Sequence, residues 1–189
     1  MPIKLTIAET VEQMDAVYKL RHQVFCEESD KFSQTQDARF FDRFDAYPTS
    51  ANVIATNDND VVGTLRLAID SGLGVPADEY YDFRSHLPAD CSLLGVGMFC
   101  VGKEFRNSRV TLKLIQTAIC YAVERGISHV VGPINPDIAK LVKRIGFDIV
   151  DSEVIEPHTG LPILPAILDM GNVNDFYTTF AKKEPVVKF

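Results

Sequence analysis

The chain has 189 residues, 46% hydrophobic and 24% charged, a composition that suits one domain with a substantial core and excludes a disordered tail protein. Its 19 Lys and Arg residues against 26 Asp and Glu residues give a net charge of -7, so we expect no nucleic-acid partner. Residues 1–10 lack the apolar run of a signal peptide, and no later segment has the roughly 18 apolar residues of a membrane span. We therefore expect a soluble, cytoplasmic protein.

The cysteines and histidines form no pattern of a disulfide framework or a metal site. They are Cys26, Cys91, Cys100, Cys120, His22, His86, His129 and His158. The cysteines form no Cys-x-x-Cys pair and stand mostly within apolar runs, so we interpret them as reduced core residues. The histidines are scattered, and we expect no bound metal.

The first half of the chain begins with a strand and a helix. Residues 3–8 alternate between apolar and polar side chains, as a strand does. Thr10 and Gln13 then have the spacing of a capping box in front of an apolar series with helical spacing. The pattern predicts a helix over residues 11–26.

A hairpin follows further along the first half. The apolar runs 52–56 and 61–69 flank an Asn/Asp cluster, which is typical of an antiparallel hairpin. The segment 27–48 is rich in Phe and in charged residues but has no clear period, and we interpret it as an ordered active-site segment. Residues 72–88 are predicted to be a linker with room for a short helix.

The second half of the chain alternates strands with helices. Gly126 suits the end of one helix, and Pro136 suits the first turn of the next. Strands are predicted over residues 92–101, 129–132, 147–154 and 163–169, and helices over 108–125 and 136–145. These crossovers, combined with the hairpin, predict one α/β (α+β) domain with a mixed sheet.

Two segments of the second half carry a family signature. They are Val-Gly-Lys-Glu-Phe-Arg at 101–106 and Asn-Pro-Asp-Ile-Ala-Lys-Leu-Val-Lys-Arg-Ile-Gly-Phe at 135–147. Together they resemble the acyl-CoA-binding motif and the following Asn…Ala…Gly-Phe motif of the GNAT acyltransferase superfamily. The resemblance implies one GNAT-like domain over residues 1–189, with a mostly antiparallel, twisted central sheet flanked by helices.

Three segments of the first half narrow the resemblance. They read Leu-Arg-His-Gln-Val-Phe-Cys-Glu-Glu at 20–28, Phe-Asp-Arg-Phe-Asp at 41–45 and Val-Gly-Thr-Leu-Arg-Leu at 62–67. In this order they are similar to motifs of the acyl-homoserine lactone (autoinducer) synthases and the related N-acyl amino acid synthases. The likeness implies an acyl-thioester-dependent N-acyltransferase, with residues 1–91 as the acceptor side and residues 92–189 as the thioester-binding side.

The thioester site implied by the resemblance lies where the strand ending at Val101 separates from the next strand. Backbone donors at Phe99 and Cys100 would face the thioester carbonyl, and the start of the long helix would bind the phosphate of a phosphopantetheine arm. The residues expected to bind this co-substrate are Val101, Arg106, Asn107, Ser108, Arg109, Val110, Thr111 and Asn135. An ordinary strand-to-helix turn with solvated arginines is the alternative. No tightly bound cofactor is expected.

The loop before that helix departs from the superfamily. Most members have Arg-x-x-Gly-x-Gly or Ala, whereas residues 106–111 read Arg-Asn-Ser-Arg-Val-Thr and lack the glycines that let a backbone approach a pyrophosphate closely. The departure favours an acyl carrier protein over CoA as the donor. Seven basic residues around the implied entrance suit an acidic carrier protein, with ordinary solvated charge as the alternative. They are Lys103, Arg106, Arg109, Lys113, Lys140, Lys143 and Arg144.

The customary proton-transfer groups of these families are absent from the sequence. Gly95 stands where the lactone synthases have an acidic residue, and Val142 stands where many GNAT enzymes have a tyrosine. Three explanations stay open: another carboxylate takes the proton, the thiolate leaves without an acid, or the protein binds without catalysing.

Asp42 and Asp45 are the best candidates for the first explanation. Three positions apart, they can converge on one cation, and Arg66 is the expected partner because a charge within an apolar strand needs pairing. Arg21 stands in a similar setting, and Arg21, Phe25 and Arg66 are expected to contact the substrate. An ion network that only fastens the first half of the chain to the sheet is the alternative. Phe25 and the phenylalanines after it either line an acyl tunnel or close a core.

The sequence thus predicts transfer of a medium or long acyl group from an acyl carrier protein or CoA thioester to the amine of an amino acid or related small-molecule acceptor. The amine attacks directly, and no covalent enzyme intermediate is expected. The alternatives are a short-chain, acetyl-CoA-dependent N-acetyltransferase and a non-catalytic sensor of acyl thioesters or metabolites.

Overall fold

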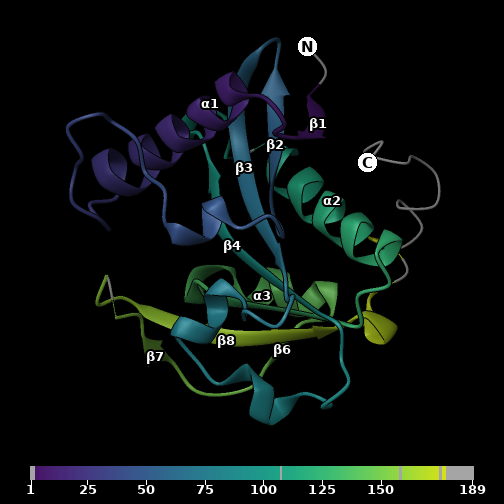
Figure 1. The fold of residues 1–189 in the computed structure, drawn as a ribbon. Coiled ribbons are helices and arrows are strands. Elements are labelled where there is room, and N and C mark those ends of the chain that lie inside the picture. Colours follow the sequence, from purple (N-terminus) through teal and green to yellow (C-terminus); the bar gives the residue numbers. More distant parts are fainter. Residues whose placement is uncertain (1–2, 107, 158, 175, 178–189) are drawn as a thin grey trace.

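The computed structural model describes residues 3–106, 108–157, 159–174 and 176–177 (Figure 1). The described residues form an eight-stranded sheet in the order β1-β2-β3-β4-β5-β8-β6, in which β7 also pairs with β8. The strands are β1 (Lys4–Ile7), β2 (Ser50–Asn57), β3 (Asp60–Ile69), β4 (Leu93–Val101), β5 (His129–Ile134), β6 (Asp148–Ile149), β7 (Val154–Ile155) and β8 (Pro162–Asp169). Neighbours run antiparallel except for the parallel pair β4 and β5, which confirms the predicted mixed, mostly antiparallel sheet.

Helices cover both faces of the sheet. The α-helices of the described residues are α1 (Val11–His22), α2 (Val110–Glu124) and α3 (Ala139–Ile145). Shorter helical turns are η1 (Gln23–Glu28), η2 (Arg43–Ala46), η3 (Pro76–Glu79), η4 (Phe83–His86), η5 (Lys103–Phe105), η6 (Pro136–Ile138) and η7 (Met170–Asn172). In Figure 1, α1 and α2 stand on opposite sides of β2 and β3. These helices are all too short or too polar to span a lipid bilayer.

The main core fills one face of the sheet, which we call the α2 face because α2 and α3 cover it. Leu67 of β3, Leu114 of α2, Ile145 of α3 and Leu168 of β8 are fully buried members of this core. The opposite face, called the α1 face, is covered by α1 and by the linker between β3 and β4. Two smaller clusters fill it, one beneath α1 and one that contains Phe83 of the linker. The strands β4, β5 and β8 therefore contribute alternate side chains to the main core and to the clusters of the α1 face.

The first helix begins where the sequence predicts. The Gln13 N–H donates to Thr10 Oγ1 at 3.2 Å, and Gln13 Oε1 accepts from the Thr10 N–H at 3.2 Å, so the capping box is confirmed. The α-helix ends at His22 and continues as the π-helical turn η1 to Glu28, two residues beyond the predicted end. Such π turns occur frequently at functional sites.

The hairpin of β2 and β3 and the helix α2 are also confirmed, but the predicted strand over 147–154 is wrong. Two short strands take its place: β6 pairs with residues 166–167 of β8, and β7 pairs with residues 162–163. The exposed Asp-Ser-Glu run at 151–153 separates them, and the Ser152 N–H donates to Asp151 Oδ1 at 2.7 Å. Polar residues of this kind favour a local turn over a sheet ladder, so the strand is interrupted.

Candidate active site

The parallel strands β4 and β5 pair over a short stretch and then separate. Their paired residues run from Leu93 with His129 to Gly95 with Val131, although β4 continues to Val101 and β5 to Ile134. Beyond Gly95 the backbone groups of β4 on this side have no partner in β5. The separation agrees with the gap that the resemblance implied for a pantetheine arm.

A bulge in β4 lies at this gap. Arg66 of β3 pairs with Gly97, and Thr64 pairs with Cys100, so β4 has one more residue than β3 in this stretch. Met98, within the bulge, has a φ of +49°, which is uncommon for a residue other than glycine. Backbone held in such sparsely populated conformations is concentrated at functional sites.

A cavity of about 790 Å³ reaches both faces of the sheet beside the bulge. On the α2 face its walls are aliphatic side chains of α2, α3 and the sheet, and we call this part the aliphatic end. Its lining includes Ile115, Ala118, Ile119, Val130, Val142, Ile145 and Leu168. On the α1 face the cavity has charged and aromatic walls, and we call this part the polar end. Its lining includes Phe25, Phe32, Phe40, Asp42, Arg66, Tyr80 and Glu156.

The ion network expected at the acceptor side is present. Arg66 Nη1 lies 2.5 Å from Asp42 Oδ1 and 3.2 Å from Asp45 Oδ2. Arg21 Nη1 lies 3.0 Å from both oxygens of Asp45, and Arg21 Nη2 donates to the amide oxygen of Asn52. The two aspartates also cap the turn η2: the Phe44 N–H donates to Asp42, and the Asp42 N–H donates to Asp45. The network therefore joins α1, η2, β2 and β3.

The two aspartates differ in their access to the cavity. The Asp45 side chain is 2% exposed and lies beneath the two arginines, whereas the Asp42 side chain is 29% exposed and lines the polar end. Burial alone raises the pKa of Asp45, but the charges of Arg21 and Arg66 outweigh it and hold that pKa below its usual range. The Nε atoms of both arginines are buried without a hydrogen-bond partner among the described residues.

Aromatic side chains line the polar end beside this network. The rings of Phe25 and Phe40 meet edge to face with centroids 5.9 Å apart, and those of Phe32 and Phe40 lie 4.4 Å apart. Phe44 is buried, and its ring faces the Arg66 guanidinium at 5.6 Å. Phe25, Phe32 and Phe40 thus pack against one another and also form a cavity wall, but on the α1 face and away from the aliphatic end.

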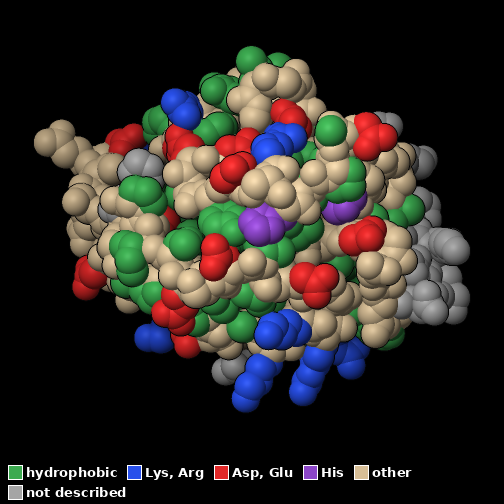
Figure 2. Space-filling model, turned by 90° about the horizontal axis from the view of Figure 1, so that it is seen from below, with side chains coloured by type: hydrophobic (Ala, Val, Ile, Leu, Met, Phe, Trp, Pro, Cys, Tyr) green, Lys and Arg blue, Asp and Glu red, His purple; other side chains and the backbone are tan. Residues whose placement is uncertain are grey.

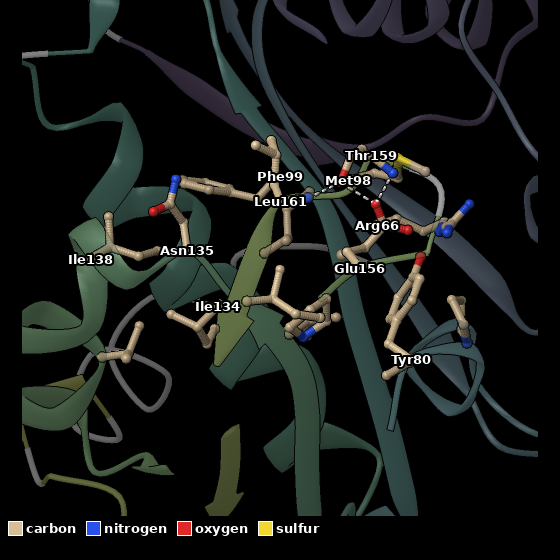
Figure 3. A pocket seen from close by; sticks show the side chains of 18 of the residues that line it. Arg66, Tyr80, Met98, Phe99, Ile134, Asn135, Ile138, Glu156, Thr159 and Leu161 are labelled. Carbon is tan, nitrogen blue, oxygen red and sulfur yellow. Dashed lines mark hydrogen bonds between the residues drawn. The ribbon is translucent and has the colours of Figure 1, made fainter. Parts of the chain in front are cut away.

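Two polar residues at the polar end had not been expected from the sequence. Tyr80 follows η3 in the linker, and Glu156 begins the turn between β7 and β8. Figure 3 shows their side chains pointing toward Arg66. Burial raises the pKa of the Tyr80 phenol to about 12, with the nearby carboxylate of Glu156 contributing. In the sequence Glu156 stands between Val-Ile and Pro. These residues show neither a period nor a motif, so the sequence gives no sign that Glu156 lines a functional site.

The backbone donors expected at Phe99 and Cys100 lie at and just after the bulge. Phe99 lines the cavity, whereas the Cys100 side chain is buried beneath α1 with Leu20 and Val24. Burial raises the pKa of the Cys100 thiol to about 12, so this thiol is protonated at neutral pH and unsuited to nucleophilic attack.

The described residues expected to bind the phosphopantetheine arm lie from the end of β4 to the first turn of α2, apart from Asn135. The Val110 N–H donates to Ser108 Oγ at 3.2 Å, and the first-turn N–H groups that follow, including that of Thr111, have no partner within an α-helix. Arg106 Nη2 donates to Glu28, and Arg106 Nε donates to the Val101 carbonyl oxygen at 3.0 Å. Arg106 therefore joins η1 to the end of β4. Arg109 is exposed, with no ion pair to any described residue.

Two further residues complete the expected set. Asn135 lines the cavity rim at the end of β5, where its side-chain oxygen accepts a hydrogen bond from the Asp137 N–H at 2.9 Å (Figure 3). Asn107 lies outside the described residues.

The seven basic residues of the expected carrier-protein surface have different surroundings. The Lys113 ammonium donates to the Ile3 carbonyl oxygen at 3.2 Å, and Arg106 is paired with Glu28. The other five are exposed: Lys103, Arg109, Lys140, Lys143 and Arg144. On the face seen in Figure 2, several Lys and Arg side chains gather along the lower edge and others lie near the upper edge, while Asp and Glu side chains are spread between them.

Comparison with known proteins shows the family of this chain. The family model of the N-acyl amino acid synthase FeeM matches residues 16–169. The chain belongs to the FeeM family. It is therefore an N-acyltransferase.

Solved structures resemble this FeeM-family chain in fold at low sequence identity. FeeM from uncultured soil microbes matches with a TM-score of 0.78 and 17% identity over 90% of this chain and 91% of its own. An acyl-CoA N-acyltransferase from Pseudomonas aeruginosa matches with a TM-score of 0.67 and 17% identity over 88% of this chain and 99% of its own. BjaI, a CoA-dependent acyl-homoserine lactone synthase solved with SAM and isopentyl-CoA, matches with a TM-score of 0.68 and 15% identity over 99% of this chain and 93% of its own. Comparison with curated proteins finds no match. The GNAT-like fold is confirmed.

Proposed function

We propose that this FeeM-family protein transfers a medium or long acyl group from an acyl carrier protein to the amine of an amino acid or related small molecule. The aliphatic end of the cavity is the observation that carries the proposal. It extends from the bulge in β4 into the core between α2, α3 and the sheet. An acetyl group needs only a shallow site, whereas the two ends of the cavity together enclose about 790 Å³, which is within the range of sites that enclose large ligands.

Each part of the site has a role in this reaction. The pantetheine arm lies in the gap between β4 and β5, and the acyl chain enters the aliphatic end. The backbone N–H of Phe99 stabilises the negative charge that develops on the thioester oxygen during attack. The acceptor lies in the polar end against Phe25, Asp42 and Arg66, with the Asp45–Arg21 pair holding Arg66 in place.

The donor is proposed to be a carrier protein rather than CoA. The single phosphate of a phosphopantetheine arm can be bound by the first-turn N–H groups of α2 and the charge of Arg109 alone. The loop at residues 106–111 has no glycine that would let its backbone approach the pyrophosphate of CoA closely. The five exposed basic residues of η5, of α3 and of the cap before α2 suit an acidic protein surface. A cytoplasmic location agrees with the four free cysteines.

The test measures products over a matrix of donors and acceptors. Purified protein is incubated with acyl groups of two to sixteen carbons, each on carrier protein and on CoA, together with the twenty proteinogenic amino acids, and amides are identified by mass spectrometry. We expect long-chain amides that form faster from the carrier protein. Acetyl-CoA as the best donor would support a short-chain N-acetyltransferase instead, and binding of acyl donors without any amide would support a sensor.

A further inference from the structure

Gly97 lies in the middle of the central strand β4 and lines the cavity. We propose that Gly97 is a specificity-determining residue, because its missing side chain leaves the space in which the side chain of an amino-acid acceptor lies. This inference rests on the proposed function and adds to it that the acceptor is an amino acid larger than glycine. Three features lead to Gly97: the face of the sheet to which it belongs, the open space above it, and its place beside the bulge.

The register of the sheet places Gly97 on the face of the polar end. Gly97 pairs with Arg66 of β3, and residues directly opposite one another in a sheet point to the same face. The adjacent pair, Val96 with Leu67, alternates with it and packs in the main core on the α2 face. Arg66 lines the polar end, where it binds Asp42. A side chain at position 97 would therefore point into the polar end beside Arg66.

The two glycines of this strand differ in what lies above them. A Cβ built on Gly95 would lie 2.7 Å from the Val75 Cβ, so the linker fills that space. A Cβ built on Gly97 would meet no heavy atom of the described residues within 4 Å, apart from its chain neighbours. Burial agrees with this contrast, because Gly95 is buried, whereas the four residues 96–99 are half-buried and line the cavity. The linker thus covers β4 as far as Gly95 and leaves the polar end open at Gly97.

The backbone at position 97 does not itself require glycine. The φ of Gly97 lies outside the left-handed region, whereas that of the next residue, Met98, is +49°. An alanine at position 97 would therefore be neither strained nor crowded by the fold. The glycine affects the volume of the polar end and not the packing of the sheet.

The proposed reaction brings the acceptor to this space. The acceptor nitrogen attacks the thioester carbon beside the Phe99 N–H, and position 97 is only two residues away along β4, no more than about 7 Å. An amino acid can span this distance from its nitrogen to the end of a large side chain. The acyl chain enters the aliphatic end on the opposite face of the sheet, so it does not occupy the space at Gly97. The acceptor side chain therefore lies over Gly97 and beside Arg66.

The experiment measures kcat/KM for three acceptors in wild-type protein, Gly97→Ala and Gly97→Val. One is the amino acid that the wild-type protein acylates fastest. The others lack a side chain: glycine, with the same ammonium and carboxylate, and hydroxylamine, which is smaller still. The ratio of the first kcat/KM to either of the others should fall about tenfold in Gly97→Ala and at least about 100-fold in Gly97→Val, because each added methyl group takes space that the acceptor side chain needs. A ratio within one variant does not depend on the amount of folded protein.

Gly95→Ala is the matched contrast, with the same substitution two residues earlier on the same face of β4. Gly95→Ala should lower Tm, because its Cβ meets Val75, and should leave the ratios unchanged. Gly97→Ala should change the ratios without lowering Tm, since its Cβ meets no neighbour and alanine restricts the unfolded chain more than glycine does. Thermal unfolding measures the difference between the two variants.

Several results would overturn the proposal. They are unchanged ratios in both Gly97 variants, or glycine as the fastest acceptor of the wild-type protein. An equal loss with all three acceptors would assign the space at Gly97 to the acyl donor instead, and a Tm that falls as far in Gly97→Ala as in Gly95→Ala would give Gly97 a packing role. Wild-type protein that forms no amide with any amino acid contradicts the proposed function itself, a result distinct from those of the variants.

Discussion

Removal of Arg66 is the most direct perturbation of the network beneath the polar end. The guanidinium is 2% exposed and binds Asp42 at 2.5 Å and Asp45 at 3.2 Å. In Arg66→Ala the Asp45 carboxylate keeps Arg21 but loses its second cation, and Asp42 loses its ion pair. We therefore expect both lower stability and weaker acceptor binding from one substitution.

The magnitude follows from the burial of the pair. Removing one partner of a buried ion pair costs about 3–5 kcal/mol of unfolding free energy, since the remaining charge stays out of water. For a chain of 150–250 residues each kcal/mol lowers Tm by roughly 2–4 °C, so Tm should fall by roughly 6–20 °C. Thermal unfolding followed by circular dichroism measures the loss, and the KM for the acceptor, which should rise more than the KM for the acyl donor, measures the effect on binding.

Arg43→Ala is the control, because Arg43 forms an exposed ion pair with Glu79 at 2.5 Å. Such surface pairs contribute about 0–1 kcal/mol, so its Tm should change by no more than a few degrees. Equal changes in Arg66→Ala and Arg43→Ala would refute the reasoning, as the stability of the network would then not depend on its burial. A large Tm loss with an unchanged acceptor KM would leave the network as scaffold only.

Three further predictions concern acid stability, chain length and docking. The pKa of Asp45 is lower in the folded than in the unfolded protein, so the Asp45 carboxylate stabilises the fold fully above about pH 4. This stabilisation is lost as the pH falls through the pKa of the folded protein. Asp45→Asn should therefore reduce the fall of Tm at acidic pH, which thermal unfolding at a series of pH values measures. Ala118→Phe should shorten the preferred acyl chain and lower kcat/KM about fourfold for each methylene group that no longer fits the cavity, which assays with donors of increasing chain length measure. Val123→Phe, on the exposed side of α2, is the control and should leave the chain-length preference unchanged. Lys140→Glu with Lys143→Glu should raise the KM for acyl carrier protein and weaken its salt dependence, with little change in the KM for acyl-CoA; an equal rise for both donors would contradict a docking surface.

Most of the fold and the charged part of the site follow from local rules in the sequence. The capping box at Thr10, the Asn/Asp turn between β2 and β3 and the apolar spacing of α2 each depend on residues close together in the chain. Arg66 was predicted to need a partner because it is a charge within an apolar strand, and the Asp42 and Asp45 carboxylates lie within 3.2 Å of it. The spacing of nearby residues and the free-energy cost of an unpaired buried charge were enough to predict these features from the sequence.

Features that depend on contacts between distant segments could not be predicted in this way. The bulge at Met98 is defined by the register of β4 against β3, and no residue type in Val-Gly-Met-Phe requires it. The position of Glu156 depends on where β7 pairs along β8, and the sequence pattern gave a single strand up to Val154 in place of β6 and β7. A carboxylate enters a cavity or faces solvent according to that register, which is a property of two segments together.

The glycine at position 95 connects several of these differences. From the sequence alone, Gly95 marks the absence of an acid. In the fold it allows close packing, since even a Cβ there would lie 2.7 Å from Val75. Because Val75 directly precedes the turn η3 and Tyr80 directly follows it, close packing at Gly95 brings the Tyr80 phenol to the polar end, where it lies near Glu156. With a pKa of about 12, that phenol is a hydrogen-bond donor at neutral pH and not a base. The missing acid on β4 and the packing of the linker, which carries Tyr80, are thus consequences of one arrangement.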